Sequence, residues 1–316
     1  GLSQLGVEAV CRAGLEQFNA LGQEAERYRN RIGMLLDSIT TTIPALDVWP
    51  VIVAAGRGTR ARATGLNVPK PLAEVAGLPA VRRVLSVVQR GTSLTRPPII
   101  IVSPQTESGV REALEGEDVI FVLQPQAYGT GDAVLCAEEQ MRGFTGLALI
   151  MWSTQPVIRV ETVRRTLKLA ALFDDYKMFV PTALKPNPYA PISRNQNGQV
   201  LAARETHLEN ADSFSFGETN IGLFVLKSEA MFERLRQLRR RYWNEAEQRY
   251  TRAKGELGFP NELIGILSEQ EIGVLASPIA DAREEQGIKG LEDIARCEQF
   301  ILELQTNDER GTMNAE

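Results

Sequence analysis

A segment rich in glycine and cations follows the first strongly apolar run of the chain. The segment, GRGTRARATGLNVPKPL at residues 56–72, holds three glycines, four cations and two prolines, and it comes directly after the run VIVAA. Glycine lets backbone N–H groups approach a ligand closely, and arginine and lysine carry the positive charge that an anion attracts. The types and spacing of these residues predict a loop that holds phosphate groups.

The spacing in this loop differs from two well-known phosphate motifs. A Walker loop needs GxxxxGK followed by Ser or Thr, and the dinucleotide motif GxGxxG needs a third glycine, which is missing here. Arg60 offers a planar charged fork instead, and Lys70 offers a mobile ammonium group. The loop alone does not decide whether a nucleotide is bound in order to react or only bound.

The elements around the loop are those of a mostly parallel sheet. Short apolar runs alternate with helical patterns, which predicts a Rossmann-like mixed, mostly parallel sheet with helices on both faces. The strands are expected at 51–56, 98–103, 119–124 and 147–152, and the helices at 78–90, 107–116 and 130–142. Ligands of such sheets bind at the carboxyl ends of the strands, so we expect the loop at that edge.

The second half of the chain has a mixed pattern. It predicts strands at 177–184, 220–226 and 272–279, a hairpin at 192–205 with a type I′ turn at Asn197-Gly198, and helices at 228–254, 261–269 and 291–304. One of these helices has an arginine cluster that we interpret as a solvated helix face rather than a nucleic-acid site. The cluster comprises Arg234, Arg236, Arg239, Arg240 and Arg241.

The first 40 residues carry one apolar seam, with apolar or small residues spaced alternately by three and four over residues 7–39. This pattern predicts a long helix or a helix pair. The seam either docks on its own domain or forms a coiled-coil contact with another subunit, and the second alternative gives a homo-oligomer. We therefore expect a helical extension at 1–48, a main domain at 49–304 and a tail at 305–316, with the main domain divided near residue 176.

Composition limits the class of protein. The chain has 316 residues, 43% of them hydrophobic, and a net charge of −5, which is enough for a sizeable core and argues against a general nucleic-acid or membrane-surface binder. Three widely spaced cysteines suggest neither a disulfide framework nor a zinc site. No apolar run approaches the roughly 20 residues of a membrane span. A cytoplasmic protein fits these features best.

The longer sequence string is more specific than the loop. A strand, then GRGTR, then PKPL, then AGLP and a helix resemble the signature of the sugar-phosphate nucleotidyltransferase superfamily, and most of all the uridylyltransferase domain of bacterial N-acetylglucosamine-1-phosphate uridylyltransferases. The resemblance continues in the same order through VLQPQAYGTGDAVLCA, YAPISRNQNGQVLAARE, ETNIGLFVL and EEQGIKGLEDIARCE. It covers roughly residues 50–300.

The resemblance implies a reaction between a nucleoside triphosphate, with UTP favoured, and a sugar 1-phosphate, with release of pyrophosphate. It implies that Arg60 holds the leaving pyrophosphate and that Lys70 bridges the phosphates of donor and acceptor. Nucleotide contacts are implied for Ala55, Gly56, Gly58, Thr59, Gln124, Gly129 and Thr130, and sugar contacts for Ala190, Glu205 and Asn220. Because catalysis in this reaction lies in positioning and charge neutralisation, a chain with a single histidine suffices.

The family's magnesium ligands are missing. The resemblance places an aspartate after the fourth strand, where this chain has Thr154, and an asparagine or aspartate two residues after a glycine, where it has Lys289. A threonine hydroxyl is a weak ligand of Mg²⁺, and an ammonium group cannot bind a cation. A protein-bound Mg²⁺ is therefore not supported at the expected positions.

Three explanations remain open. In the first, Lys289 supplies charge that the metal gives in the family, Mg²⁺, if used, is bound by the triphosphate alone, and the protein is an enzyme with an atypical site. Alternatively, the chain is a pseudoenzyme that binds a nucleotide or nucleotide sugar, or regulates another protein, without turnover. In the third, the correspondence is shifted and another aspartate takes the metal, with Asp132, Asp174, Asp175 and Asp281 as candidates. We favour the enzyme.

Overall fold

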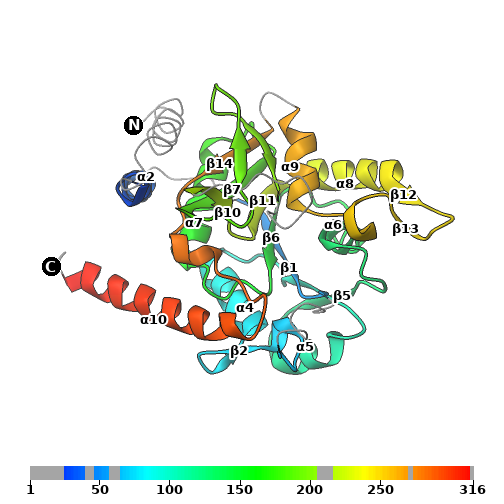
Figure 1. The fold of residues 1–316 in the computed structure, drawn as a ribbon, viewed down its shortest axis with the longest axis horizontal. Helices are drawn as coiled ribbons and strands as arrows, with labels where there is room; N and C mark the ends of the chain where they lie inside the picture. Colours follow the sequence, from blue (N-terminus) through cyan, green and yellow to red (C-terminus); the bar gives the residue numbers. More distant parts are fainter. Residues whose placement is uncertain (1–24, 40–45, 57–64, 205–215, 270–272, 314–316) are drawn as a thin grey trace.

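The apolar runs of the sequence form one eight-stranded sheet in the computed structural model, which describes residues 25–39, 46–56, 65–204, 216–269 and 273–313 (Figure 1). The strand order is β10 (Phe216–Asn220), β7 (Met178–Pro186), β11 (Leu223–Lys227), β6 (Leu147–Trp152), β1 (Val48–Val53), β4 (Ile99–Val102) and β5 (Ile120–Leu123), and β14 (Val274–Ser277) also pairs with β7.

The strand directions place several chain segments at one edge. β5, β4, β1 and β6 are all parallel, whereas β11 is antiparallel to both β6 and β7. β7 therefore runs in the same direction as β6. The segments that follow β1, β5, β6 and β7 all leave the sheet at its carboxyl edge, which confirms the predicted Rossmann-like, mostly parallel architecture.

Helices cover both faces because successive strand residues point to opposite sides. Ile52, Ile100 and Leu149 pack in one core cluster with α4 (Ala80–Gly91), α5 (Glu107–Ala113) and α7 (Val160–Leu172). Their neighbours Val51 and Ile150 pack in a second cluster. That second cluster includes residues of α6 (Thr130–Leu135), α8 (Ser228–Tyr242) and α9 (Pro260–Ser268).

The described part of the N-terminal extension is one helix, α2 (Ala25–Ser38), which packs on α7. Ile32 and Leu36 are fully buried in the first core cluster. Arg29 forms an ion pair with Asp281 at 2.6 Å, so α2 is also tied to a segment near the C-terminus. Over residues 25–38 the apolar seam thus packs against the chain's own domain. The rest of the predicted seam lies outside the described residues, and the domain boundaries and self-association stay predictions.

Two predicted helices are shorter than expected. The helix predicted at 130–142 ends as α6 at Leu135, and the chain continues in tighter turns in which Ala137 N bonds to Val134 O and Glu138 N to Leu135 O. The helix predicted at 228–254 ends as α8 at Tyr242, and a small ribbon of β12 (Trp243–Asn244) and β13 (Arg249–Tyr250) follows. The Trp243 ring packs edge-on against Tyr128 and Tyr250, and this packing outweighs helix propensity.

The predicted hairpin forms, but its turn differs from the expected type. β8 (Ile192–Arg194) and β9 (Val200–Ala203) pair antiparallel. Gly198 has φ 79°, whereas Asn197 does not have the positive φ that a type I′ turn requires. The Asn195 carboxamide oxygen accepts hydrogen bonds from the N–H groups of Asn197 and Gln199, so a side-chain turn replaces the predicted one.

A third cluster joins the end of the glycine-rich loop to the C-terminal helix α10 (Glu292–Met313). Leu66 and Ala73 are buried in it together with Ile288 and Cys297. The small ribbon of β2 (Glu74–Val75) and β3 (Leu78–Pro79) contacts α10, which runs along one side of the molecule (Figure 1). The cluster brings the PKPL segment and the segment around Lys289 into one neighbourhood.

Candidate functional site

The start of the glycine-rich loop lies at the carboxyl edge of the sheet. Ala55 is buried directly after β1, and Gly56 is exposed with open space around its Cα. The predicted phosphate contacts Gly58, Thr59 and Arg60 lie outside the described residues, as does the predicted sugar contact Glu205. Their roles stay predictions.

The PKPL segment forms a single turn that positions Lys70. The turn is the 3-10 helix η2 (Lys70–Leu72), in which Leu72 N bonds to Pro69 O at 2.8 Å and Ala73 N to Lys70 O at 3.2 Å. Pro71 is buried. The Leu72 side chain lies so close to Gly109 of α5 that a Cβ at Gly109 would be 2.4 Å from it. The lysine backbone is therefore held between fixed neighbours.

Hydrogen bonds within the protein orient the side chain of Gln124. It follows β5 and is 2% exposed, and its Nε2 donates to Gly129 O at 3.1 Å and to Asp132 Oδ2 at 3.0 Å. The Tyr250 hydroxyl donates to the other oxygen of Asp132 at 2.7 Å. Burial, together with this bond, raises the pKa of Tyr250, so the hydroxyl stays a donor. Since both Nε2 neighbours are acceptors, the carbonyl Oε1 of Gln124 is the atom left for a ligand.

Gly129 is required by both conformation and space. Its φ of 103° and ψ of 173° fall in a region that only glycine adopts readily, and a Cβ there would lie 2.3 Å from Leu257 O. The next residue, Thr130, is exposed, and its hydroxyl accepts a hydrogen bond from Phe259 N at 2.9 Å. The ring of Phe259 in turn packs edge-on against Trp152 at the end of β6. The predicted nucleoside segment is thus joined to the centre of the carboxyl edge.

We expect Gly129→Ala to lower the free energy of unfolding by about 2–4 kcal/mol, because backbone strain and overpacking add. Urea unfolding measures the loss. The matched control is Gly116→Ala, since Gly116 also has a positive φ of 82° but nothing within 4 Å of a Cβ, and it is expected to lose only about 1 kcal/mol. Equal losses in the two variants would show that the contact with Leu257 does not matter.

The structure brings the predicted sugar residues Ala190 and Asn220 together. Ala190 N donates to the Thr219 hydroxyl at 3.1 Å, and Ala190 O accepts from Asn220 N at 3.4 Å. Asn220 is 8% exposed, at the end of β10. Its Nδ2 lies 3.5 Å from Ala190 O. These contacts fix the orientation of both residues.

The two positions expected to bind magnesium are neighbours. Ile288 N donates to Thr154 O at 2.9 Å, which joins the segment after β6 to the residue just before Lys289. Gly287 lies against Gln155, where a Cβ would be 2.7 Å from the side-chain oxygen. The Lys289 ammonium group lies 3.7 Å from the centre of the Tyr189 ring and 4.0 Å from Glu285 Oε1. The segments of Thr154 and Lys289 are therefore neighbours, and their correspondence to the family's metal ligands stays a prediction.

These residues do not fit a protein-bound Mg²⁺. The nearby groups include a threonine hydroxyl and an ammonium group, and the latter repels a cation. Within the described ranges, no group of three or more His, Cys, Asp or Glu side chains is placed to hold a metal ion.

The four alternative aspartates are placed for other roles. Asp132 uses both carboxylate oxygens on Gln124 and Tyr250. Asp281 is bonded by Arg29 and Arg283, and although burial alone would raise the pKa of Asp281, these partners hold it well below its usual value. Asp174 and Asp175 are exposed after α7, before the amino end of β7. The structure therefore argues against a shifted correspondence.

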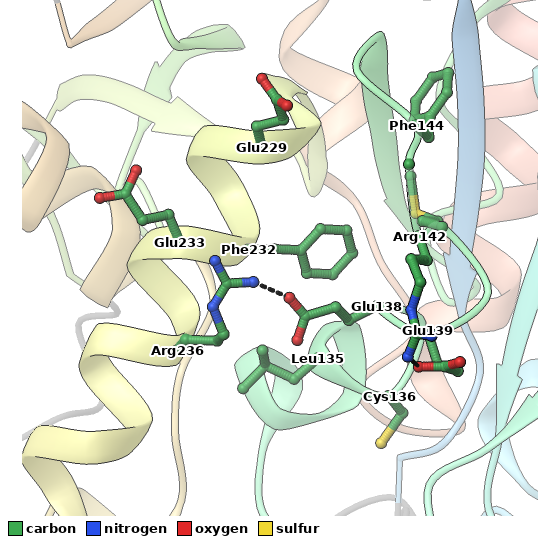
Figure 2. Close-up of a pocket in the computed structure, with 12 residues that line it drawn as sticks. Leu135, Cys136, Glu138, Glu139, Arg142, Phe144, Glu229, Phe232, Glu233 and Arg236 are labelled. Carbon is green, nitrogen blue, oxygen red and sulfur yellow. Dashed lines mark hydrogen bonds and ion pairs between the residues drawn. The ribbon is translucent and has the colours of Figure 1, made fainter.

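A half-open hollow of about 880 Å³ lies at the opposite edge of the sheet, between residues 135–144 and α8 (Figure 2). Residues 135–144 precede the amino end of β6, whereas the predicted site follows the carboxyl end. Ion pairs join Arg236 to Glu138 and Arg142 to Glu139, and Glu229 and Glu233 also line the hollow (Figure 2). Four carboxylates against two guanidinium groups make it unsuitable for a triphosphate.

The sequence analysis missed three residues that orient predicted site residues. Tyr250 holds Asp132, and Tyr189 and Glu285 hold Lys289. Glu285 and Lys289 are four apart, a spacing that can signal a pair. Tyr189 is the first residue of the segment YAPISRNQNGQVLAARE that carries the resemblance, but the sequence does not signal its contact with Lys289, and it does not signal that Tyr250 lies at the site.

A mostly parallel sheet with a glycine- and cation-rich loop at its carboxyl edge defines a nucleotide-binding α/β protein. Residues 50–249 match the MobA-like NTP transferase domain, and the chain belongs to this family. The assignment to the nucleotidyltransferases that the sequence motifs predicted is confirmed.

Curated relatives agree with this assignment. The chain is 28% identical over 257 residues to the bifunctional protein GlmU of Streptococcus thermophilus, covering 80% of this chain and 51% of that protein. It is 29% identical over 257 residues to the GlmU protein of Geobacter metallireducens, with 80% and 50% covered. It is 29% identical over 252 residues to that of Shouchella clausii, with 79% and 51% covered. The chain spans about half the length of these relatives.

Among the helices that the structure describes, none is long and apolar enough to cross a membrane.

Proposed function

We propose that the protein joins a nucleoside triphosphate, with UTP favoured, to a sugar 1-phosphate and releases pyrophosphate. An oxygen of the sugar phosphate attacks the α-phosphorus of the nucleotide, a new P–O bond forms, and the bond to the leaving pyrophosphate breaks. No covalent link to the protein is needed, so the chain's own residues act by positioning the two substrates and by neutralising charge.

The contact between Thr154 and Ile288 is the observation that carries this proposal. It brings the backbone of the residue before Lys289 to Thr154, and the Lys289 ammonium group lies over the ring of Tyr189, which supports a role for that group in adding the positive charge that the metal gives in the family. An ammonium group can supply part of that charge, although it does not template the phosphates as a metal does. Lys289 then neutralises the phosphate of the acceptor while Lys70 bridges donor and acceptor.

The orientation of the Gln124 amide is compatible with binding of a base that donates a ring N–H. The Nε2 of Gln124 is used by Gly129 and Asp132, which leaves Oε1 as the amide atom that could accept a hydrogen bond from a base. Uracil offers an N–H at its pairing edge, whereas cytosine and adenine offer a ring acceptor there. Because the exocyclic amino groups of cytosine and adenine can also donate to an amide oxygen, this contact alone does not choose the base, and UTP is favoured by the resemblance.

The alternative function is binding of a nucleotide or nucleotide sugar without turnover, and the exchange of both metal-ligand positions favours it. One experiment separates the two. Purified protein is mixed with each of the four nucleoside triphosphates and N-acetylglucosamine 1-phosphate or glucose 1-phosphate, and both pyrophosphate release and the melting temperature are measured. We expect pyrophosphate release, fastest with UTP. A nucleotide-dependent rise in melting temperature without release from any pair would establish the binding function instead.

A further inference from the structure

Two lysines share one buried carboxylate beside Thr154. Glu285 ends the short helix η4 (Ala282–Glu285) and its side chain is 5% exposed. Its Oε2 lies 2.7 Å from Lys185 Nζ, and its Oε1 lies 4.0 Å from Lys289 Nζ. Oε1 is buried and accepts no hydrogen bond. A single ammonium group would balance the charge of this carboxylate, so the cluster carries one positive charge in excess.

The cluster lies between the two halves of the predicted site. Lys185 is near the carboxyl end of β7, which leaves the sheet at the same edge as β6. Tyr189 follows four residues later, lies over the Lys289 ammonium group and precedes Ala190. On its other side, Lys289 follows the residue that bonds to Thr154. The lysine pair therefore lies where phosphates and sugar would meet.

The surroundings of Glu285 hold it in place. Asp281 caps η4, and Glu284 accepts hydrogen bonds from Arg159 N and from the Thr162 hydroxyl, both at 2.8 Å. Arg29 of α2 bonds to Asp281. The turn that carries Glu285 is thus fixed on α7 and α2, which preorganises the two ammonium groups.

We propose that Lys185 is a second phosphate-binding residue, paired with Lys289 through Glu285, and that the pair holds the diphosphate of the nucleotide sugar. The proposal rests on the proposed function for the identity of that ligand. Where the second ligand of the family is asparagine rather than aspartate, an Mg²⁺ held by it and by one aspartate also leaves one positive charge in excess. The lysine pair therefore keeps the charge of the family's site with different chemistry.

The test separates a phosphate contact of Lys185 from a simple partner role toward Glu285. Affinities are measured by calorimetric titration in chelator with two probes, inorganic pyrophosphate and UDP-N-acetylglucosamine. The compared variants are Glu285→Gln and the double variant Lys185→Met/Glu285→Gln. Both lack the buried carboxylate, so the removal of Lys185 in the double variant does not leave a buried Glu285 charge without its partner. Lys177→Met, at the amino end of β7, is the control for loss of a lysine elsewhere.

We expect the double variant to bind both probes about 10–100-fold more weakly than Glu285→Gln, because a hydrogen bond to a charged group is lost. Glu285→Gln itself is expected to bind at least as tightly as the wild type, since both cations remain. Lys177→Met should bind as the wild type does. Melting temperatures of all variants show that each is folded.

Equal affinities of the double variant and Glu285→Gln would overturn the proposal, since Lys185 would then only neutralise Glu285. Weakening for pyrophosphate alone, with UDP-N-acetylglucosamine bound normally, would overturn the assignment to the nucleotide sugar. If the wild type binds pyrophosphate but not UDP-N-acetylglucosamine, the proposed function is wrong about the base or the sugar. The pyrophosphate titration then still decides whether Lys185 binds phosphate.

Discussion

The Lys289→Ala variant is expected to lose about 10²–10³-fold in kcat for pyrophosphate release, the loss seen when one preorganised group that stabilises developing charge is removed. The Lys289 ammonium group lies over the Tyr189 ring and 4.0 Å from Glu285 Oε1, and both contacts favour this position before substrate binds. A coupled assay of pyrophosphate release under saturating substrates measures kcat.

Two comparisons make this result specific to position 289. Lys289→Arg keeps the positive charge and should retain more activity than alanine, although a guanidinium group fits the Tyr189 ring differently. Lys177 directly precedes the amino end of β7, at the edge of the sheet opposite the predicted site, and Lys177→Ala should leave kcat unchanged. If Lys289→Ala were as active as the wild type, the charge that replaces the metal would have to come from elsewhere.

The Asp132→Ala variant is expected to lose about 3–4 kcal/mol of unfolding free energy. The substitution leaves the buried Tyr250 hydroxyl without a partner and removes one of the two hydrogen bonds of Gln124 Nε2, which keeps its bond to Gly129 O, and each lost partner costs about 1–3 kcal/mol. Tyr250 is 1% exposed, so water does not replace the lost bond. The Gln124 amide is then oriented only by its bond to Gly129 O, and affinity for UTP should fall about tenfold, the effect of roughly one hydrogen bond.

The control for Asp132→Ala is Asp175→Ala, an exposed residue expected to change stability by less than about 0.5 kcal/mol. The double variant Asp132→Ala/Tyr250→Phe removes the hydroxyl that Asp132→Ala leaves unpaired. Its loss of unfolding free energy should therefore be smaller than the sum of the losses of the two single variants. Urea unfolding gives all of these values. A loss below about 1 kcal/mol for Asp132→Ala would mean that the Gln124–Asp132–Tyr250 chain does not hold the site.

The centre of the fold was predictable because β1, β4 and β6 are largely buried on both faces, and the edge strand β5 beside them is also a short apolar run. The runs at 98–103, 119–124 and 147–152 became β4, β5 and β6 with shifts of at most one residue at each end. Such strands are continuous apolar runs, which few other elements produce. The run at 51–56 was placed three residues too late, because β1 begins at Val48 and includes Trp49 and Pro50.

Helix ends were less predictable because distant contacts set them. The end of α8 depends on Trp243 packing against Tyr128, which lies more than a hundred residues earlier. Asn244 then closes the following turn by accepting from the N–H groups of Ala246 and Glu247. Helical periodicity alone carries no information about such partners.

The candidate site also combines residues that motifs predicted with residues that only the structure reveals. Motif order predicted Gln124, Thr154, Ala190 and Lys289, and the structure places Thr154 beside the segment of Lys289 and Tyr189 against Lys289. Lys185 and Tyr250 carry no motif, and only the packing of β7 against η4 and of β13 against α6 brings them to the site. Residues that orient others are recognised from contacts rather than from spacing.

Pyrophosphate release by the wild-type protein, measured side by side with Lys289→Ala and in the presence of chelator, tests the central claim most directly. The account predicts release from UTP and a sugar 1-phosphate that persists in chelator and is lost in Lys289→Ala. No release from any pair of substrates, or release that stops in chelator and is unchanged in Lys289→Ala, would contradict it.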